Sequence, residues 1–117
     1  MSELRITHYV VDDIPVISLE GKITIGEGPL ILREAIAKHL SGETKALVIE
    51  LRECRYVDSS GICELVNTFT TTNRKGIRVA YADVGAKLLD LLKITKLLTL
   101  FDIYDSVHEA VQSLKEA

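Results

Sequence analysis

The sequence predicts a small α/β fold in which an antiparallel hairpin precedes parallel strands that alternate with helices. Three observations lead to this prediction. Apolar and polar side chains alternate along residues 4–11, which is the period of a strand. Short runs of branched apolar residues return at 46–51 and 77–81. Segments with helical spacing of apolar residues separate these runs, so repeated β-α-β units are expected, with parallel strands and helices covering the sheet.

Composition limits the classes of protein that remain. The chain has 117 residues, with 14 Lys and Arg against 17 Asp and Glu and a formal net charge of -3. This length predicts a single domain over 1–117. The mild acidity argues against nucleic acid as the partner. Charged residues interrupt the longest apolar stretch, 88–101, so no membrane span is expected. With no signal peptide at the start, we expect a cytoplasmic protein with two free thiols, Cys54 and Cys63.

The first two strands are predicted to form a hairpin. Asp12 and Asp13 interrupt the extended pattern, which resumes over 14–19. Pro15 cannot donate a hydrogen bond to a neighbouring strand, so it is expected at the start or the edge of its strand.

The later elements follow from turn residues and capping signals. Gly28 and Pro29 start a helix that Ser41 and Gly42 end. Further elements are predicted as strand 46–51, a helix with apolar residues from 62 to about 72, strand 77–81, helix 86–92, extended segment 100–104, and a last helix to about 115 capped by Ser106 and Glu109. The order is therefore β-β-α-β-α-β-α-β-α, with about four helices.

The turn Asp58-Ser59-Ser60-Gly61 carries the functional signal. It lies at the carboxyl end of a buried strand and opens a helix, and ligands usually bind at that edge of a parallel sheet. The first turn of a helix offers unpaired N–H groups and a positive dipole end, which suit a phosphate monoester. Asp58 or Ser59 could cap the helix, and Gly61 permits close approach of a backbone or a partner. Such residues cap many helices, so the tetrapeptide alone does not distinguish a cap from a switch.

The wider stretch, 48–51 through 57–65, resembles the signature of the STAS domain, and more narrowly the anti-sigma factor antagonists of bacterial partner-switching systems. The resemblance covers nearly the whole chain and implies a STAS-like mixed sheet. It also implies that Ser59 accepts a phosphoryl group from a serine kinase that is itself the anti-sigma factor, with Ser60 as the lesser candidate. A serine phosphatase would restore Ser59. Asp58 would orient the Ser59 hydroxyl or hold the turn.

The same resemblance implies a partner-binding surface around this turn. Its expected members are Asp58, Ser59, Ser60, Gly61, Ile62, Cys63, Glu64, Thr24 and Gly26. The chain departs from the family pattern at two places. Thr24 stands where an acidic residue is common, and Ile62, Cys63 and Glu64 place larger and polar groups at the helix start. These departures leave the partner open. A stressosome-type scaffold that binds other STAS proteins or itself, or a ligand-sensing STAS module, stays an alternative.

Other phosphate and catalytic chemistries fit the residues less well. Asp12 and Asp13 resemble the acidic pair of a receiver domain, but an extended segment follows them where a receiver has a helix. Gly21-Lys22 lacks the earlier glycine of a phosphate-binding loop. The three histidines are expected to be surface or packing residues rather than a catalytic base for Ser59. The two cysteines lack the spacing of metal ligands. We therefore predict a binding protein, not an enzyme, with no cofactor and no metal.

Overall fold

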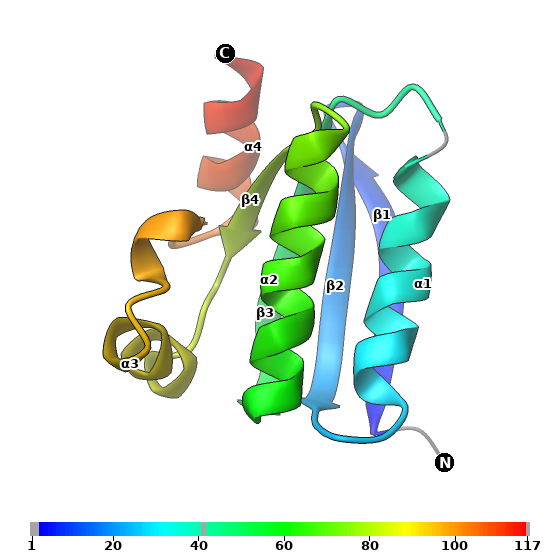
Figure 1. Ribbon diagram of the computed structural model, residues 1–117. Helices are drawn as coiled ribbons and strands as arrows, with labels where there is room; N and C mark the ends of the chain where they lie inside the picture. The colour runs from blue at the N-terminus through cyan, green and yellow to red at the C-terminus, as the bar shows by residue number, and fades with distance from the viewer. Residues whose placement is uncertain (1–2, 41, 117) are drawn as a thin grey trace.

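Five strands lie in one sheet in chain order, β1-β2-β3-β4-β5, in the computed structural model, which describes residues 3–40 and 42–116 (Figure 1). The strands are β1 Leu4–Val11, β2 Ile14–Ile23, β3 Ala46–Val57, β4 Arg78–Ala82 and β5 Asp102–Tyr104. The helices are α1 Gly28–Leu40, α2 Ser59–Arg74, α3 Ala86–Ile94 and α4 Val107–Lys115, with a short 3₁₀ helix, η1, at Leu98–Leu100. Their order is the predicted one.

The predicted hairpin is present at the start of the sheet. β1 pairs antiparallel with β2, and each later pair of neighbouring strands is parallel. Asp12 and Asp13 form the connecting turn with φ angles of 50° and 67°. A two-residue turn with positive φ at both positions matches the right-handed twist of the two strands that it joins. Pro15 is the second residue of β2 and lies opposite Val10 on the edge strand β1.

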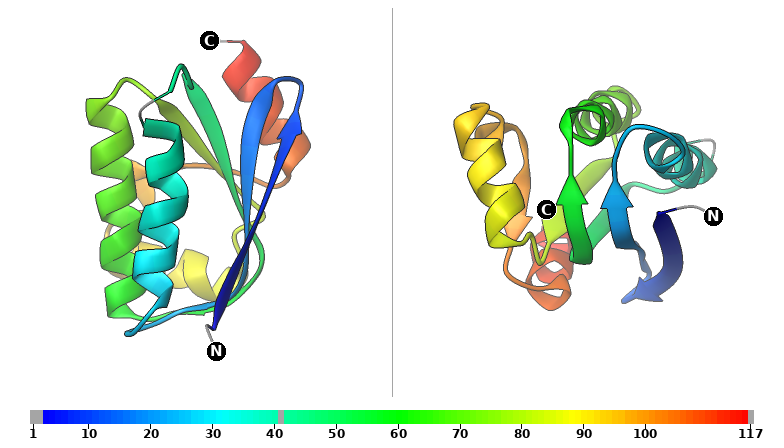
Figure 2. Two further views of the ribbon diagram at one scale, coloured as in Figure 1. Left: turned by 90° about the vertical axis from the view of Figure 1, so that its right-hand side faces the viewer. Right: turned by 90° about the horizontal axis from the view of Figure 1, so that it is seen from below.

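The helices divide unequally between the two faces of the sheet. α1, α2 and α3 lie on one face and α4 lies on the other (Figure 2). Because the parallel strands advance in one direction across the sheet, right-handed crossovers place the three connecting helices on the same side. The larger core, which includes Ile17, Ile49 and Leu65, lies beneath those helices. A smaller core joins Val48 and Val111 under α4.

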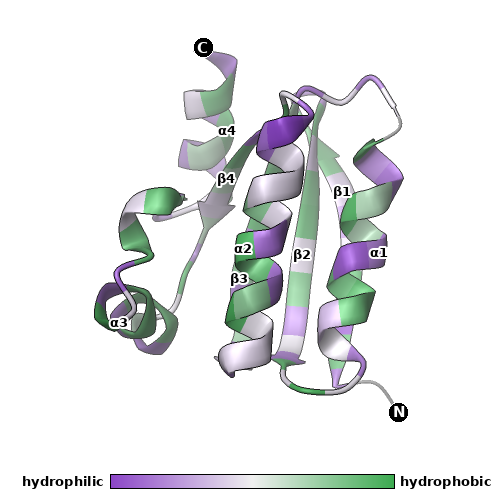
Figure 3. Cartoon of the chain, in the orientation of Figure 1, coloured by the Kyte–Doolittle hydropathy of each residue, from purple (hydrophilic) through white to green (hydrophobic). Residues whose placement is uncertain are grey.

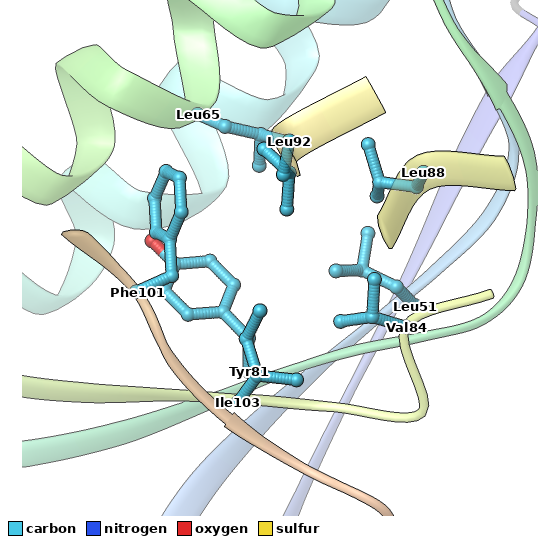
Figure 4. A pocket seen from close by; sticks show the side chains of 8 residues that line it. All are labelled: Leu51, Leu65, Tyr81, Val84, Leu88, Leu92, Phe101 and Ile103. Atoms are coloured by element: carbon cyan, nitrogen blue, oxygen red, sulfur yellow. The ribbon is translucent and has the colours of Figure 1, made fainter. Parts of the chain in front are cut away.

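The leucine-rich helix α3 packs on the sheet, as its sequence predicts, and it carries both hydrophobic and hydrophilic side chains (Figure 3). Leu88 and Leu92 are buried, whereas Leu91 is half-buried. A small apolar cavity remains beneath α3 and is lined by Leu88, Leu92, Phe101 and Tyr81, among others (Figure 4). The Tyr81 ring packs edge-on against Phe101 at 4.8 Å between ring centroids. α3 therefore rests on the sheet through a few leucine side chains.

Several element boundaries differ from the predicted ones. β3 continues to Val57, six residues beyond the predicted end, because β2 goes on pairing with it as far as Ile23. The segment predicted as extended over 100–104 begins as the 3₁₀ helix and becomes β5 only at Asp102. Gly42 lies just beyond α1, and Ser41, predicted to end that helix with it, lies outside the described residues.

Candidate functional site

Asp58 is the centre of the predicted turn. It is the N-cap of α2, with extended backbone angles of φ -91° and ψ -172°. Its Oδ1 accepts hydrogen bonds from the Gly61 backbone N–H at 3.0 Å and from the Ser60 hydroxyl at 2.7 Å. Its Oδ2 accepts from the Ile25 backbone N–H at 2.9 Å. The Asp58 N–H donates to the Ile23 carbonyl at 3.2 Å. One residue thus joins the start of α2 to the end of β2 and the loop that follows it.

These donors also stabilise the ionised form of Asp58. The hydrogen bond from the Ser60 hydroxyl lowers the pKa of Asp58 below its ordinary value, with further lowering from the backbone N–H groups of Ile25 and Gly61. A carboxylate that accepts several hydrogen bonds prefers to stay charged. Of the two roles predicted for Asp58, it holds the turn. Within the described residues, the hydroxyl that it binds is that of Ser60, and no hydrogen bond joins it to the Ser59 hydroxyl.

Gly61 is required by close contact within the chain. A Cβ at this position would lie 2.2 Å from the Ile23 carbonyl oxygen and 2.6 Å from Val57 Cγ1. Gly61 is also buried. The close approach that its sequence position predicts is made by the backbone of β2. This contact presses the first turn of α2 against the end of β2.

Ser59 is the first residue of α2, and its side chain is exposed. No hydrogen bond of its hydroxyl occurs among residues 3–40 and 42–116. Ser60 differs from it, because Ser60 is half-buried and its hydroxyl is committed to Asp58. Two adjacent serines thus have distinct environments, one open to an approaching molecule and one used within the turn.

The loop after β2 lies beside this turn. Thr24 is half-buried, and its hydroxyl donates to Glu3 Oε2 at 2.9 Å. Gly26 is exposed with φ 123°, a conformation that favours glycine. Between them, the Ile25 side chain is 84% exposed while its N–H is bound to Asp58. Thr24 therefore contacts the residue just before β1, and the exposed members of the loop are Ile25, Gly26 and Glu27.

The start of α2 presents fewer groups to solvent than the sequence predicts. Ile62 is buried, Cys63 is exposed, and Glu64 is only 3% exposed. Glu64 Oε1 accepts from Arg33 Nη2 at 2.8 Å, and its Oε2 accepts from Asn67 Nδ2 at 3.1 Å. The same contact raises the pKa of Arg33. The prediction that Ile62 and Glu64 lie on the exposed docking surface is wrong, because Ile62 faces the core and Glu64 ties α2 to α1.

Arg33 and the exposed apolar residues near the turn are not predicted from the sequence. Tyr56 and Ile94 are 54% and 78% exposed, and both line a shallow depression that also includes Ser59 and Lys87. Nothing in the local pattern marks these residues, since single exposed apolar side chains are common on protein surfaces. The position of Glu64 on the inner side of α2, one residue before Leu65, was the available signal for a buried partner.

The two cysteines are free. Cys54 is half-buried, and burial raises the pKa of its thiol to about 11, so it is a poor nucleophile. The described residues hold no group of three or more metal-ligating side chains. Within the same residues, no helix is long and apolar enough to cross a membrane.

The sequence model of the STAS domain family matches residues 5–110 of the chain. The chain belongs to the STAS domain family. Within this family it is similar to two curated anti-sigma factor antagonists. One is the anti-sigma-B factor antagonist of Bacillus subtilis (strain 168), 28% identical over 96 residues, which cover 82% of this chain and 86% of the relative. The other is the anti-sigma F factor antagonist of Paenibacillus polymyxa, 29% identical over 69 residues. That second alignment spans 59% of each protein.

A solved structure shows the same fold. The crystal structure of an anti-sigma factor antagonist from Mycobacterium paratuberculosis superposes with a TM-score of 0.83 and 21% sequence identity. The match covers 96% of this chain and 94% of the other. Together with the observed sheet, this establishes the STAS fold that the sequence predicts.

Proposed function

We propose that this STAS domain is an anti-sigma factor antagonist, a protein-binding switch of the bacterial cytoplasm that phosphorylation of Ser59 turns off. The unmodified protein binds a kinase-type anti-sigma factor and so frees the sigma factor. The kinase then phosphorylates Ser59 and dissociates, and a serine phosphatase restores the hydroxyl. The chain itself performs no catalysis in this cycle. Both curated relatives carry antagonist names, which supports this assignment.

The exposed and uncommitted hydroxyl of Ser59 is the observation that carries the proposal. A kinase needs access to the oxygen that it modifies, and the backbone around Ser59 is held in place by Asp58. The N-terminal end of α2 favours a phosphate, because unpaired N–H groups and the helix dipole both attract negative charge. Modification at this position therefore leaves the fold intact and changes only the surface.

The surroundings of Ser59 explain how such a change would release a partner. Exposed Tyr56 and Ile94 line the same depression as Ser59, and Ile25 is exposed on the loop bound to Asp58. Apolar side chains of this kind contribute most to binding when a partner excludes water from them. A phosphate adds about -1.5 to -2 charges and a strongly held water shell. A partner that covers this surface would then have to desolvate a dianion, so its affinity falls.

Binding to the kinase-type anti-sigma factor of the same host tests the proposal. The Ser59→Ala variant should co-elute with this partner as the wild type does, and the Ser59→Asp variant should not. Asn73→Asp is the matched control, because it adds the same charge at an exposed position near the opposite end of α2. Mass spectrometry of protein isolated from the host should find one phosphoryl group on the peptide that contains Ser59.

Two results would count against the switch. Capture of the partner by Ser59→Asp at wild-type strength would remove Ser59 from the mechanism. A phosphoryl group found on Ser60 instead would move the modification to the hydroxyl that Asp58 binds.

A further inference from the structure

The second half of β3 has a strand partner on one side only. β4 pairs with β3 from Ala46 to Glu50 and then ends at Ala82. β2 continues to pair with β3 as far as Val57. Beyond Glu50, one edge of β3 pairs with β2. The opposite edge therefore has no neighbouring strand in the part of the chain that the structure describes. Such an edge is a template for an additional strand.

A groove separates this edge from α3. Arg52, Arg55 and Tyr56 line it from the strand, and Lys87 and Leu91 line it from the helix. The chain passes from β4 to α3 through Asp83, which has φ 56°, and Gly85, which also lines the groove. Seen along the strands, α3 lies to one side of β3 (Figure 2). An extended segment could run through this groove in contact with both walls.

The groove carries positive charge on an acidic protein. Three cationic side chains line it, those of Arg52, Arg55 and Lys87, and no carboxylate does. Arg52 is 3.9 Å from Glu53, a marginal and exposed contact, and within the described residues neither Arg55 nor Lys87 forms an ion pair. The whole chain has a net charge of -3, so this cluster of cations departs from the average surface. Their occupant should be acidic.

Apolar side chains line the groove together with the charges. Tyr56 is 54% exposed, and Leu91 is half-buried beside it in the groove. Strand addition gains affinity from main-chain hydrogen bonds and specificity from alternate side chains of the added strand. Acidic side chains of an added strand would meet the cations, and its aliphatic side chains would meet Tyr56 and Leu91.

We propose that the groove between β3 and α3 binds an extended acidic segment of a partner protein, which adds a strand to the free edge of β3 at Arg52–Val57. The occupant carries both acidic and aliphatic residues. This inference stands apart from the phosphorylation of Ser59, although the depression that includes Ser59 adjoins the groove and shares Lys87 and Leu91 with it.

Titration of the full chain, labelled for NMR, with a synthetic acetylated peptide of alternating Glu and Val tests the proposal. At millimolar peptide, we expect saturable shifts of the backbone amides of 52–57 and 85–91 that weaken as salt is raised. A peptide with Lys in place of Glu should not bind. A peptide methylated on alternate backbone nitrogens should not bind either, because it cannot form the main-chain hydrogen bonds.

Variants distinguish binding by the groove cations from a general effect of the protein's net charge. Arg55→Glu combined with Lys87→Glu should lower the affinity for the acidic peptide by about tenfold or more. Lys75→Glu, at an exposed site just beyond α2, should leave its affinity unchanged. The proposal fails if no saturable binding occurs, if the shifts map elsewhere, if the methylated peptide binds equally well, or if Lys75→Glu has the same effect. If the amide resonances of the groove shift with inorganic phosphate or ATP but not with peptide, the cations bind a small anion. That result would also overturn the proposal.

Discussion

The backbone N–H of Ile25 donates a hydrogen bond of 2.9 Å to Oδ2 of Asp58. The other carboxylate oxygen of Asp58 holds Gly61 and Ser60 at the start of α2. A single side chain therefore fixes the loop after β2 relative to the turn after β3. The exposed Ile25 side chain and the exposed Ser59 hydroxyl are kept on one surface by this arrangement.

Replacement of Asp58 by Ala should lower the free energy of unfolding by about 2 kcal/mol, near the upper limit for a helix cap. The loss is large because the N–H of Ile25 loses its partner together with the cap. Ser106→Ala is the control, since Ser106 caps α4 through the Glu109 N–H at 3.1 Å and, among residues 3–40 and 42–116, its side chain joins no second loop. It should cost about 1 kcal/mol. Urea unfolding measures both, and an equal or smaller loss at Asp58 would contradict the bridging role.

Acid should destabilise the wild type partly through Asp58. Because the pKa of Asp58 is lowered in the folded state, the unfolded state binds a proton more readily. The stabilisation is therefore complete above the ordinary pKa of about 4 and is lost as pH falls through the lower folded value. In Asp58→Asn, the urea midpoint should fall less steeply below this pH. An identical slope in both proteins would show that Asp58 is not linked to folding.

Gly61→Ala should destabilise the fold by about 3 kcal/mol, the upper part of the range for overpacking. The added Cβ would lie 2.2 Å from the Ile23 carbonyl oxygen, and backbone of the central sheet cannot move as a flexible side chain can. Gly42→Ala is the control, because nothing lies within 4 Å of a Cβ there. Its effect should stay within about 0.5 kcal/mol. Thermal unfolding compares the two, and a tolerated Gly61→Ala would refute the close contact.

Replacing one or the other partner of the Arg33–Glu64 ion pair should lower the free energy of unfolding by unequal amounts. Arg33→Met leaves a carboxylate that is 3% exposed with Asn67 as its remaining hydrogen-bond partner. This should cost about 2–3 kcal/mol, less than in a fully buried pair because Arg33 is open to water. Glu64→Gln leaves Arg33, whose side chain is 61% exposed, free to be hydrated. It should cost about 1 kcal/mol. The reverse order in denaturant unfolding would contradict the burial of Glu64.

The order of the elements could be predicted because each one carries a local signal. Alternation along 4–11, the pair Asp12 and Asp13, and the cap at Ser106 all act within a few residues. The length of β3 could not be predicted in this way. Its second half is mostly polar and exposed, and it is a strand only because β2 pairs with it.

The contacts of the site were predictable in part. The sequence predicts Asp58 or Ser59 as the cap, because either side chain is suited to the N–H groups of a helix start, and the structure shows Asp58 in this role. The bond to Ile25 joins residues far apart in the sequence, and no local pattern marks it. The burial of Glu64 likewise depends on Arg33 of α1, and the sequence of α2 alone does not predict it.

The sheet adds its strands from β1 to β5 in the order in which they occur in the chain. During synthesis from the N-terminus, each new strand consequently meets a neighbour that has already left the ribosome. No strand must wait for a later one to be made before it can pair. Assembly in this order leaves unpaired strand edges exposed for only a short time, which lowers the risk of aggregation during translation.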